Sequence, residues 1–188
     1  MIYFTADLHL GHTNVLSLCN RPFLSVEEMD EALIANWNRR VKKNDTVYVI
    51  GDLIWDKKKA INYLSKLQGN KILIQGNHDH DWLKTEGART HFREIVPYLE
   101  INFNGHPITM CHYPMLEWKN SRKNNSAKLG YLVHGHIHNR TDSLYLPLFQ
   151  QEHALNAGVD INHYTPVSFD ELIENNRVFK AQFRKEDT

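Results

Sequence analysis

Residues 49–60, VIGDLIWDKKKA, run from an apolar segment into a charged one. The pair Gly51-Asp52 stands at the junction, where we expect a buried strand to end and a helix to follow. A single Gly-Asp pair is an ordinary turn, and aspartate is a common residue at the start of a helix. The pair becomes informative only if polar side chains follow other apolar segments in the same way.

The same arrangement recurs along the chain. The apolar segments expected to form strands are Ile2–Ala6, Thr46–Ile50, Lys71–Gln75, Ile108–Cys111 and Tyr131–Val133. The residues that follow them are, in order, Asp7-Leu8-His9, Gly51-Asp52, Gly76-Asn77-His78-Asp79, His112 and His134-Gly135-His136-Ile137-His138. Because ligands bind at the carboxyl ends of the strands in open α/β sheets, we expect these side chains to meet.

Helical segments separate several of the strands. Capping-box sequences at Ser25 and Ser168 each predict the start of a helix, and a further helix is expected from about Lys57 to Leu67. One more strand is expected within Ile95–Phe103, joined to the Ile108–Cys111 strand by a turn. Strands that alternate with helices and then form a hairpin predict a mixed α/β fold with packed sheets. We expect a single domain over residues 1–188.

The composition is that of an ordinary globular protein, with 41% hydrophobic and 23% charged residues. The 22 basic and 22 acidic residues cancel, which disfavours a long nucleic acid as partner because duplex-binding proteins usually carry a basic excess. Two cysteines predict no disulfide framework and suit a reducing, cytoplasmic compartment. The N-terminal segment lacks the pattern of a signal peptide, and no apolar run approaches the ~20 residues that cross a membrane.

The residues at the strand ends form a mixed nitrogen and oxygen ligand set without thiolates. Such a set suits Mn, Fe, Zn or related divalent ions. The set holds two ions if one carboxylate bridges them, and Asp52 is the natural bridge. Two ions about 3.5–4 Å apart hold a hydroxide between them and clamp a phosphate for in-line displacement.

The order of the motifs, D-x-H, G-D, G-N-H-D, a lone H and G-H-x-H, resembles the calcineurin-like metallophosphoesterase family. The resemblance runs from Asp7 to His138. It implies a four-layer α-β-β-α sandwich of two mixed sheets flanked by helices, with the metals at the sheet ends. It also implies a phosphoesterase with two divalent ions, manganese being the first expectation and Fe, Ni or Zn the alternatives.

The resemblance further implies how the ligands divide. The ligands implied for the first ion are Asp7, His9 and His138, and those for the second are Asn77, His112 and His136. Asp52 is shared, and His78 is implied as the proton donor to the leaving group, a role that suits a side chain titrating near neutral pH. His12 and His134 flank the motifs and are candidates to support the ligands.

The sequence departs from the family pattern at one position. Many relatives carry a second aspartate three residues after that of the G-D motif, where it orients the catalytic histidine, and here this position is Trp55. Asp56 and Asp79 are the two alternatives for orienting His78. Asp56 is also expected as the N-cap of the helix that follows it.

Several side chains near the motifs are candidates for binding substrate. Arg21 and Arg140 are expected to contact phosphate, because a guanidinium group pairs bidentately with phosphate oxygens; a surface salt bridge is the alternative for each. Lys57-Lys58-Lys59 either forms a solvated face or attracts an anionic substrate. Trp55 and Tyr113 either pack against a flat leaving group or belong to the core.

The sequence therefore predicts hydrolysis of small phosphodiesters or nucleotide-like phosphoesters through a metal-bridging hydroxide. The short chain leaves few residues outside the expected core for docking a protein substrate. A phosphomonoesterase and a metal-dependent nuclease are the alternative activities. A non-catalytic binding scaffold of the same fold is disfavoured, because every ligand of the pattern is present.

Overall fold

The computed structural model describes residues 1–122 and 129–183. Its first sheet has the strand order β1-β2-β3-β4. The strands are β1 (Ile2–Thr5), β2 (Thr46–Val49), β3 (Asn70–Ile74) and β4 (Phe92–Val96), and all are parallel. Helices lie in each connection, as parallel neighbours require. The expectation of two mixed sheets is therefore corrected for this one, which is entirely parallel.

The second sheet is mixed and has the order β5-β6-β7-β8. Its strands are β5 (Tyr98–Phe103), β6 (His106–Cys111), β7 (Tyr131–His134) and β8 (Ala154–Asn156). β5 and β6 form an antiparallel hairpin, and β6, β7 and β8 are parallel. Asn104 and Gly105, at the hairpin turn, have φ values of 51° and 84°, which suit a tight hairpin connection.

The strand expected within Ile95–Phe103 is confirmed as β5, but the first two residues of this stretch belong to β4, a strand that was not expected. β4 ends at Val96 in the first sheet, and β5 begins at Tyr98 in the second. Pro97 lies between them and has no N–H group to continue a ladder. The proline thus marks the point where the chain passes from one sheet to the other.

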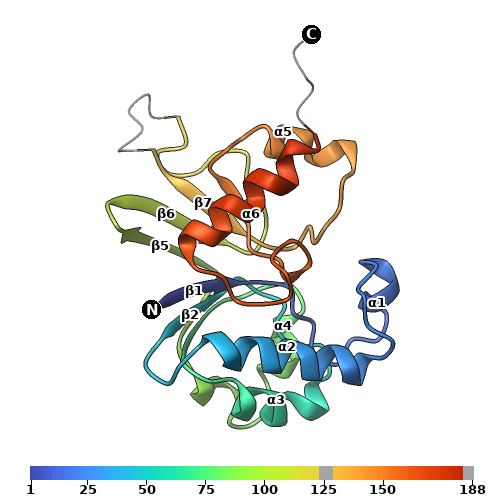
Figure 1. Cartoon of the computed structure of the whole chain (residues 1–188). Coiled ribbons are helices and arrows are strands. Elements are labelled where there is room, and N and C mark those ends of the chain that lie inside the picture. Colours follow the sequence, from blue (N-terminus) through green and yellow to red (C-terminus); the bar gives the residue numbers. More distant parts are fainter. Residues whose placement is uncertain (123–128, 184–188) are drawn as a thin grey trace.

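Two sheets between helices make the four layers visible in Figure 1. α2 (Val26–Arg40) and α3 (Ala60–Lys66) lie on one side, and α5 (Leu146–Phe149) and α6 (Phe169–Ala181) on the other. Side chains of β2 alternate between two cores: Val47 and Val49 belong to the cluster shared with α2 and α3, whereas Tyr48 belongs to the cluster between the sheets. A third cluster joins the second sheet to α5 and α6.

The predicted helix starts agree with the structure. Ser25 caps α2 by accepting a hydrogen bond from Glu28 N, and Ser168 and Glu171 form a reciprocal capping box at α6. The helix expected from Lys57 begins as a 3₁₀ turn, Lys57–Lys59, before α3. Asp56 caps this turn as predicted, with its carboxylate accepting a hydrogen bond from Lys58 N.

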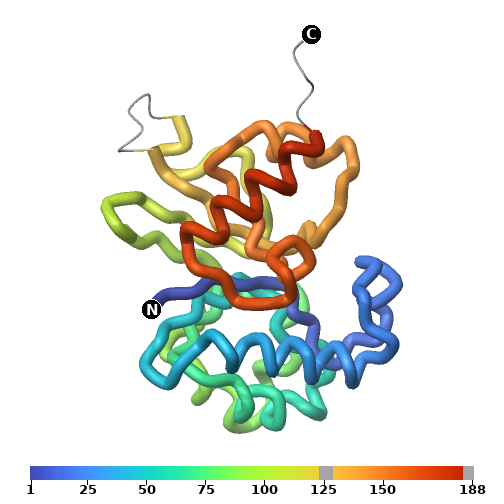
Figure 2. The backbone as a smooth tube through the Cα atoms, viewed as in Figure 1, coloured from blue at the N-terminus to red at the C-terminus, as the bar shows by residue number. Residues whose placement is uncertain are grey.

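The carboxyl ends of the two sheets are tied to each other. Ala6, just after β1, forms a bridge with Gly158, just after β8. The segment around α1 (Val15–Leu18), which follows β1, stands beside the segment that follows β7 (Figure 2), and Asn139 donates a hydrogen bond to the backbone oxygen of Cys19. The loops that follow the strands therefore converge at one end of the molecule. Within residues 1–122 and 129–183, no helix is both long and apolar enough to cross a membrane.

Candidate metal centre

The backbone at the strand ends is left-handed at five of the expected ligands. The residues with positive φ are Asp7 (58°), His9 (52°), Asp52 (54°), His136 (71°) and His138 (52°). Residues other than glycine rarely adopt this conformation, and each instance costs of the order of 1–3 kcal/mol. Such strain concentrates at functional sites, where surrounding contacts hold it in place.

Two glycines allow the loops to approach the carboxylates closely. A Cβ on Gly76 would lie 2.3 Å from Asp52 Oδ1, and one on Gly135 would lie 2.7 Å from Asp7 Oδ2. Either side chain would push a carboxylate out of place. Glycine is thus required at both positions by the packing of the expected ligands.

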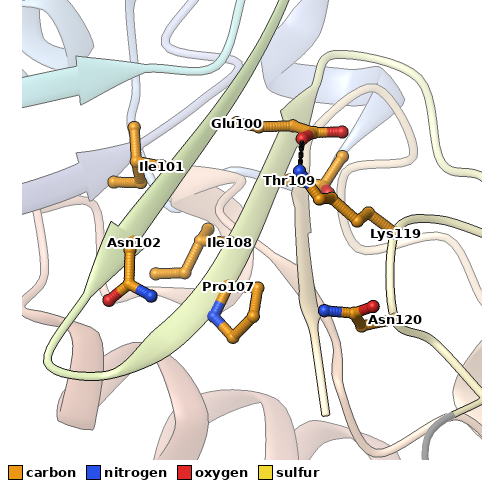
Figure 3. Close-up of a pocket in the computed structure, with 8 residues that line it drawn as sticks. All are labelled: Glu100, Ile101, Asn102, Pro107, Ile108, Thr109, Lys119 and Asn120. Atoms are coloured by element: carbon orange, nitrogen blue, oxygen red, sulfur yellow. Dashed lines mark hydrogen bonds and ion pairs between the residues drawn. The ribbon is translucent and has the colours of Figure 1, made fainter. Parts of the chain in front are cut away.

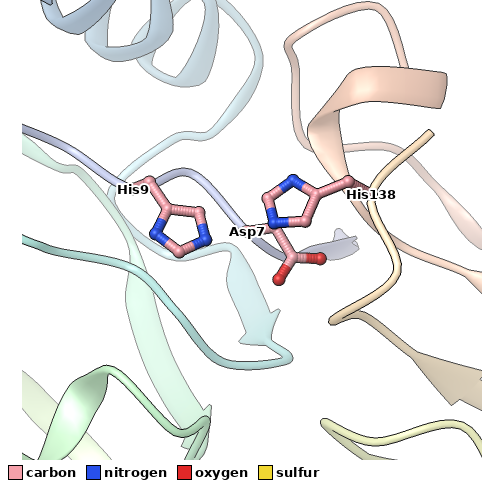
Figure 4. Close-up of side chains that lie close together, drawn as sticks. All are labelled: Asp7, His9 and His138. Carbon is pink, nitrogen blue, oxygen red and sulfur yellow. The ribbon is translucent and has the colours of Figure 1, made fainter. Parts of the chain in front are cut away.

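Asp7, His9 and His138 come together as a first cluster. One ligand atom from each lies within 4.8 Å of the others, and Figure 4 shows the carboxylate of Asp7 beside the two rings. Asp7 and His9 follow β1 in the first sheet, whereas His138 follows β7 in the second. The cluster therefore exists only because the two sheets meet at their carboxyl ends.

Asp52, His112 and His136 form a second cluster with the same spacing. The amide oxygen of Asn77 lies 3.1 Å from both His112 Nε2 and His136 Nδ1, so it belongs to this group. Asp52 Oδ2 lies 3.4 Å from His112 Nε2 and also 3.6 Å from His9 Nε2 in the first cluster. The Asp52 carboxylate thus stands between the two clusters, as a bridging ligand must.

The chemistry of this group fits divalent cations. His9 is 3% exposed, yet neither of its ring nitrogens has a hydrogen-bond partner among the residues that the structure describes. Buried polar atoms are normally satisfied, and an orphaned imidazole beside two carboxylates is suited to a metal. Carboxylate, amide and imidazole ligands without a thiolate in either cluster match borderline ions such as Mn, Fe or Zn.

The electrostatics also fit bound cations. Burial raises the pKa of Asp7 to about 6. Burial would raise the pKa of Asp52 as well, but the hydrogen bond and charge of His112 lower it to about 2. Burial would lower the pKa of His112, whereas Asp52 and Asp7 raise it to about 9. Protons on histidine thus neutralise these carboxylates in the absence of an ion, and a bound cation would replace them.

His78 lies beside the clusters rather than within them. Its backbone N–H donates to Asp52 Oδ1 at 2.9 Å, and its ring centroid is 5.5 Å from that of His9. Trp55, whose ring centroid is 4.8 Å from that of His78, stacks on His12 at 3.8 Å with an interplanar angle of 6°. Trp55 occupies the position where many relatives carry an aspartate. Its ring therefore forms an aromatic wall next to His78.

Neither acid proposed to orient His78 hydrogen-bonds to it among the described residues. The buried Asp79 carboxylate accepts hydrogen bonds from the backbone N–H groups of Asp52, Leu53 and Gly76 and from Trp82 Nε1. The Asp56 carboxylate caps the 3₁₀ turn. Both carboxylates hold the backbone, and the alternative that either of them orients the His78 ring is not supported.

A cleft of about 340 Å³ opens onto the two clusters. Its lining includes His12 and His78, the α1 side chains Val15 and Leu18, and Arg140. The Arg140 side chain is half exposed and pairs with Asp142 at 2.8 Å. The walls of the cleft thus combine candidate metal ligands, apolar side chains and a cation.

Comparison with known proteins agrees with this geometry. Residues 2–158 match the calcineurin-like phosphoesterase superfamily domain. The chain belongs to this superfamily. A protein of Methanocaldococcus jannaschii, the uncharacterized protein MJ1445, is 35% identical over 96% of this chain and 95% of its own length. The gene 66 protein of Mycobacterium phage L5 is 31% identical over 72% of this chain and 76% of its own.

A solved structure shares the fold. The protein of unknown function AQ665 from Aquifex aeolicus superposes with a TM-score of 0.72 at 28% identity, over 93% of this chain and 98% of its own. The four-layer α/β sandwich of the calcineurin-like phosphoesterases is therefore the fold of this chain.

Arg21 lies inside the protein and does not line the cleft. It is only 5% exposed, and its guanidinium donates to the carboxylate of Asp160 and to the backbone oxygens of Asp7 and Leu8. The Arg21 guanidinium already forms hydrogen bonds with groups inside the protein. The expectation that Arg21 contacts phosphate is therefore corrected. Arg140 alone of the two arginines faces the cleft.

Asp160 lies at this centre but was not among the site residues predicted from the sequence, which indicated only a late strand and turn over Asn156–Asp160. It follows β8 by four positions, and its Oδ2 lies 2.8 Å from His138 Nδ1. Its local sequence, NAGVD, follows the same rule as the other motifs, an apolar segment delivering a carboxylate at its end. That recurrence was the available signal.

His134, a candidate to support the ligands, is buried with its Nδ1 against Gly135 O and lies outside both clusters.

Another hollow, of about 320 Å³, lies on the β5–β6 hairpin (Figure 3). Its two charged groups, Glu100 and Lys119, pair with each other at 2.5 Å. The other residues that line it are Ile101, Asn102, Pro107, Ile108, Thr109 and Asn120. None of the expected ligands lines this hollow, whereas His9, Asp52, His136 and His138 line the cleft at the strand ends.

Proposed function

We propose that this chain is a metal-dependent phosphoesterase that hydrolyses small phosphodiesters or nucleotide-like phosphoesters. The observation that carries the proposal is the Asp52 carboxylate between two clusters of aspartate and histidine. Two divalent ions, when bound, supply the Lewis acidity that activates water and stabilises negative charge on a phosphate. Asp7, His9 and His138 would hold one ion, Asn77, His112 and His136 the other, and Asp52 both. Manganese is the first ion to test.

The proposed role of His78 is to protonate the leaving alkoxide. The residue lines the same cleft as Asp52 and His9, and it is held there through its backbone bond to Asp52. It is thus near the ligands without being one of them. General acid catalysis needs a proton donor that reaches the leaving oxygen from beside the phosphate, and this position provides it.

The walls of the cleft support a small substrate with a flat or apolar group. A volume of about 340 Å³ accommodates a nucleotide-sized molecule rather than a folded protein. Trp55 is 45% exposed and its ring stands beside His78, the proposed proton donor, while Tyr113 is 48% exposed and its ring stands beside His136 of the second cluster. Exposed aromatic side chains beside a reaction centre suit a base or an aromatic leaving group.

Net charge and cysteine chemistry support the proposed partners and compartment. A net charge of zero gives little long-range attraction for a polyanion, so we propose no long nucleic acid as substrate. Cys19 and Cys111 are both free thiols, which suits a cytoplasmic protein.

The test is a substrate panel on metal-free protein reconstituted separately with Mn, Fe, Ni, Zn and Mg. The panel contains bis-p-nitrophenyl phosphate, p-nitrophenyl phosphate, 2′,3′-cyclic nucleotides and a single-stranded oligonucleotide. We expect activity only with added metal and the highest kcat/KM on a small diester. Full turnover in stripped protein would refute metal dependence, a strong preference for the monoester would refute the diester assignment, and efficient internal cleavage of the oligonucleotide would refute the small-substrate assignment.

A further inference from the structure

His138 is held both at its backbone and at its ring by the segment that follows β8. Asn156 Nδ2 donates to His138 O at 2.7 Å, and Asp160 Oδ2 accepts from His138 Nδ1 at 2.8 Å. The other ring nitrogen, Nε2, faces Asp7 in Figure 4. The strained backbone and the direction of the imidazole are therefore set by residues outside the G-H-x-H motif.

Asp160 is itself fixed by Arg21. The guanidinium Nε lies 2.8 Å from Asp160 Oδ1, and its NH2 nitrogen lies 3.1 Å from Oδ2, so both carboxylate oxygens are engaged. Both side chains are fully buried. The same guanidinium donates to the backbone oxygens of Asp7 at 2.6 Å and Leu8 at 2.8 Å. Arg21 thus ties the loop of the first motif to the carboxylate that holds His138.

We propose that Asp160 is a positioning residue for the first metal site and that Arg21 holds it in place. Asp160 accepts the proton on Nδ1 of His138 and thereby presents the lone pair of Nε2 to an ion beside Asp7 and His9. A carboxylate that accepts from the far nitrogen of a ligating histidine fixes the ring and raises its basicity. The inference rests on the proposed function, because it takes this cluster to be a metal site.

In the second cluster, the far ring nitrogen of His112 contacts a backbone oxygen rather than a carboxylate. The Nδ1 of His112 lies 2.9 Å from the backbone oxygen of Ile50, which is uncharged. One histidine of the first site is thus backed by a buried carboxylate and one of the second site by a carbonyl group. The effect of removing the Asp160 charge is therefore expected at one ion and not at the other.

The test is titration of metal-free protein with Mn²⁺, followed by electron paramagnetic resonance, which reports binding without turnover. In Asp160→Asn we expect one of two dissociation constants to rise about 10- to 100-fold and the other to stay within about twofold. Arg21→Lys keeps the positive charge but loses the planar fork, and we expect a smaller rise at the same site. Adding Asp160→Asn to His138→Ala should cost little more than His138→Ala alone, because the positioned ring is already absent.

Asp30→Asn is the matched control. Asp30 is also a buried carboxylate, accepting from Gly11 N at 2.9 Å and Tyr63 OH at 2.6 Å, but it lies outside both clusters. We expect this control to lower the thermal midpoint and leave both dissociation constants unchanged. If Asp160→Asn bound both ions as tightly as the wild type, or weakened both equally, the positioning role would be refuted. If the wild type bound neither Mn²⁺ in this titration nor Zn²⁺ in a parallel calorimetric titration, the proposed function would fail and this inference with it.

Discussion

The carboxylate of Asp79 holds the backbone of Asp52, the residue that stands between the two clusters. Asp79 Oδ2 accepts from Asp52 N at 2.9 Å and from Gly76 N at 2.8 Å, and Oδ1 accepts from Leu53 N at 3.0 Å. The last residue of the G-N-H-D motif thus clamps the loops that follow β2 and β3. These loops carry the carboxylate proposed to bridge the two ions and the proposed proton donor.

Asp79→Asn should destabilise the protein rather than impair proton donation. An amide has only one accepting oxygen, and its NH₂ group would face backbone donors, which costs about 1–3 kcal/mol. We expect a lower midpoint in chemical denaturation and a proportional loss of activity on all esters. A selective loss on esters with basic leaving groups would instead show that Asp79 acts through His78.

Asp52→Asn should weaken both metal sites, because a neutral amide bridges two cations poorly. The measurement is metal content and Mn²⁺ affinity after reconstitution. Asp81→Asn is the control, since Asp81 is an exposed carboxylate paired with Lys84 and lies outside both clusters. Retention of two tightly bound ions in Asp52→Asn would contradict the bridging assignment.

His78→Ala should leave metal content near that of the wild type and slow hydrolysis of esters with basic leaving groups by roughly 10²–10⁴. Esters with acidic leaving groups need little protonation and should be affected less. The comparison is kcat across a series of aryl and alkyl esters. Loss of metal together with an equal loss on every ester would show that His78 is not the acid.

Metal binding should become tighter as the pH rises from about 6.5 to 9. Burial would lower the pKa of both His112 and His138, but the carboxylates that hydrogen-bond to them raise these values to about 9 and about 10 in the folded, metal-free protein. The stability that these protons contribute is fully present below the unfolded value of 6.5 and is lost as the pH rises through the folded values.

An incoming ion must displace the same protons, so Mn²⁺ affinity should rise by up to about tenfold per pH unit for each proton displaced. The increase in thermal midpoint on adding Mn²⁺ should therefore be larger at pH 8.5 than at pH 6.5. The measurement is a pair of thermal melts, with and without metal, at each pH. An increase that shrinks with pH would contradict these protonation states.

Arg140→Ala should raise KM several-fold for phosphate diesters with a smaller effect on kcat, because Arg140 lines the cleft and carries the positive charge that a phosphate requires. Arg177→Ala is a close control: both arginines are exposed and pair with a neighbouring carboxylate, but Arg177 lies on α6 away from the clusters. Equal kinetics for the two variants would remove Arg140 from the substrate site.

The sequence by itself determined the strands that deliver the site, the helix starts and the polar side chains that gather in the two clusters. Apolar segments that end in aspartate, asparagine or histidine are local signals, and they predicted the ends of β1, β2, β3, β6 and β7 to within a residue or two. Capping sequences are local as well, and Ser25 and Ser168 do cap their helices. The order of the motifs was sufficient to indicate the superfamily.

Only the tertiary structure decided which side chains touch. Arg21 reads as a free cation in a loop, yet a pairing across 139 residues buries it against Asp160. Asp79 is a candidate from the sequence to orient His78. In the structure, its carboxylate instead accepts hydrogen bonds from the backbone of the loops that follow β2 and β3. Hydrogen bonds between distant segments depend on how the two sheets pack, and no local pattern encodes that packing. For this reason the clustered side chains were predictable one strand at a time, whereas the residues that hold them in place were not.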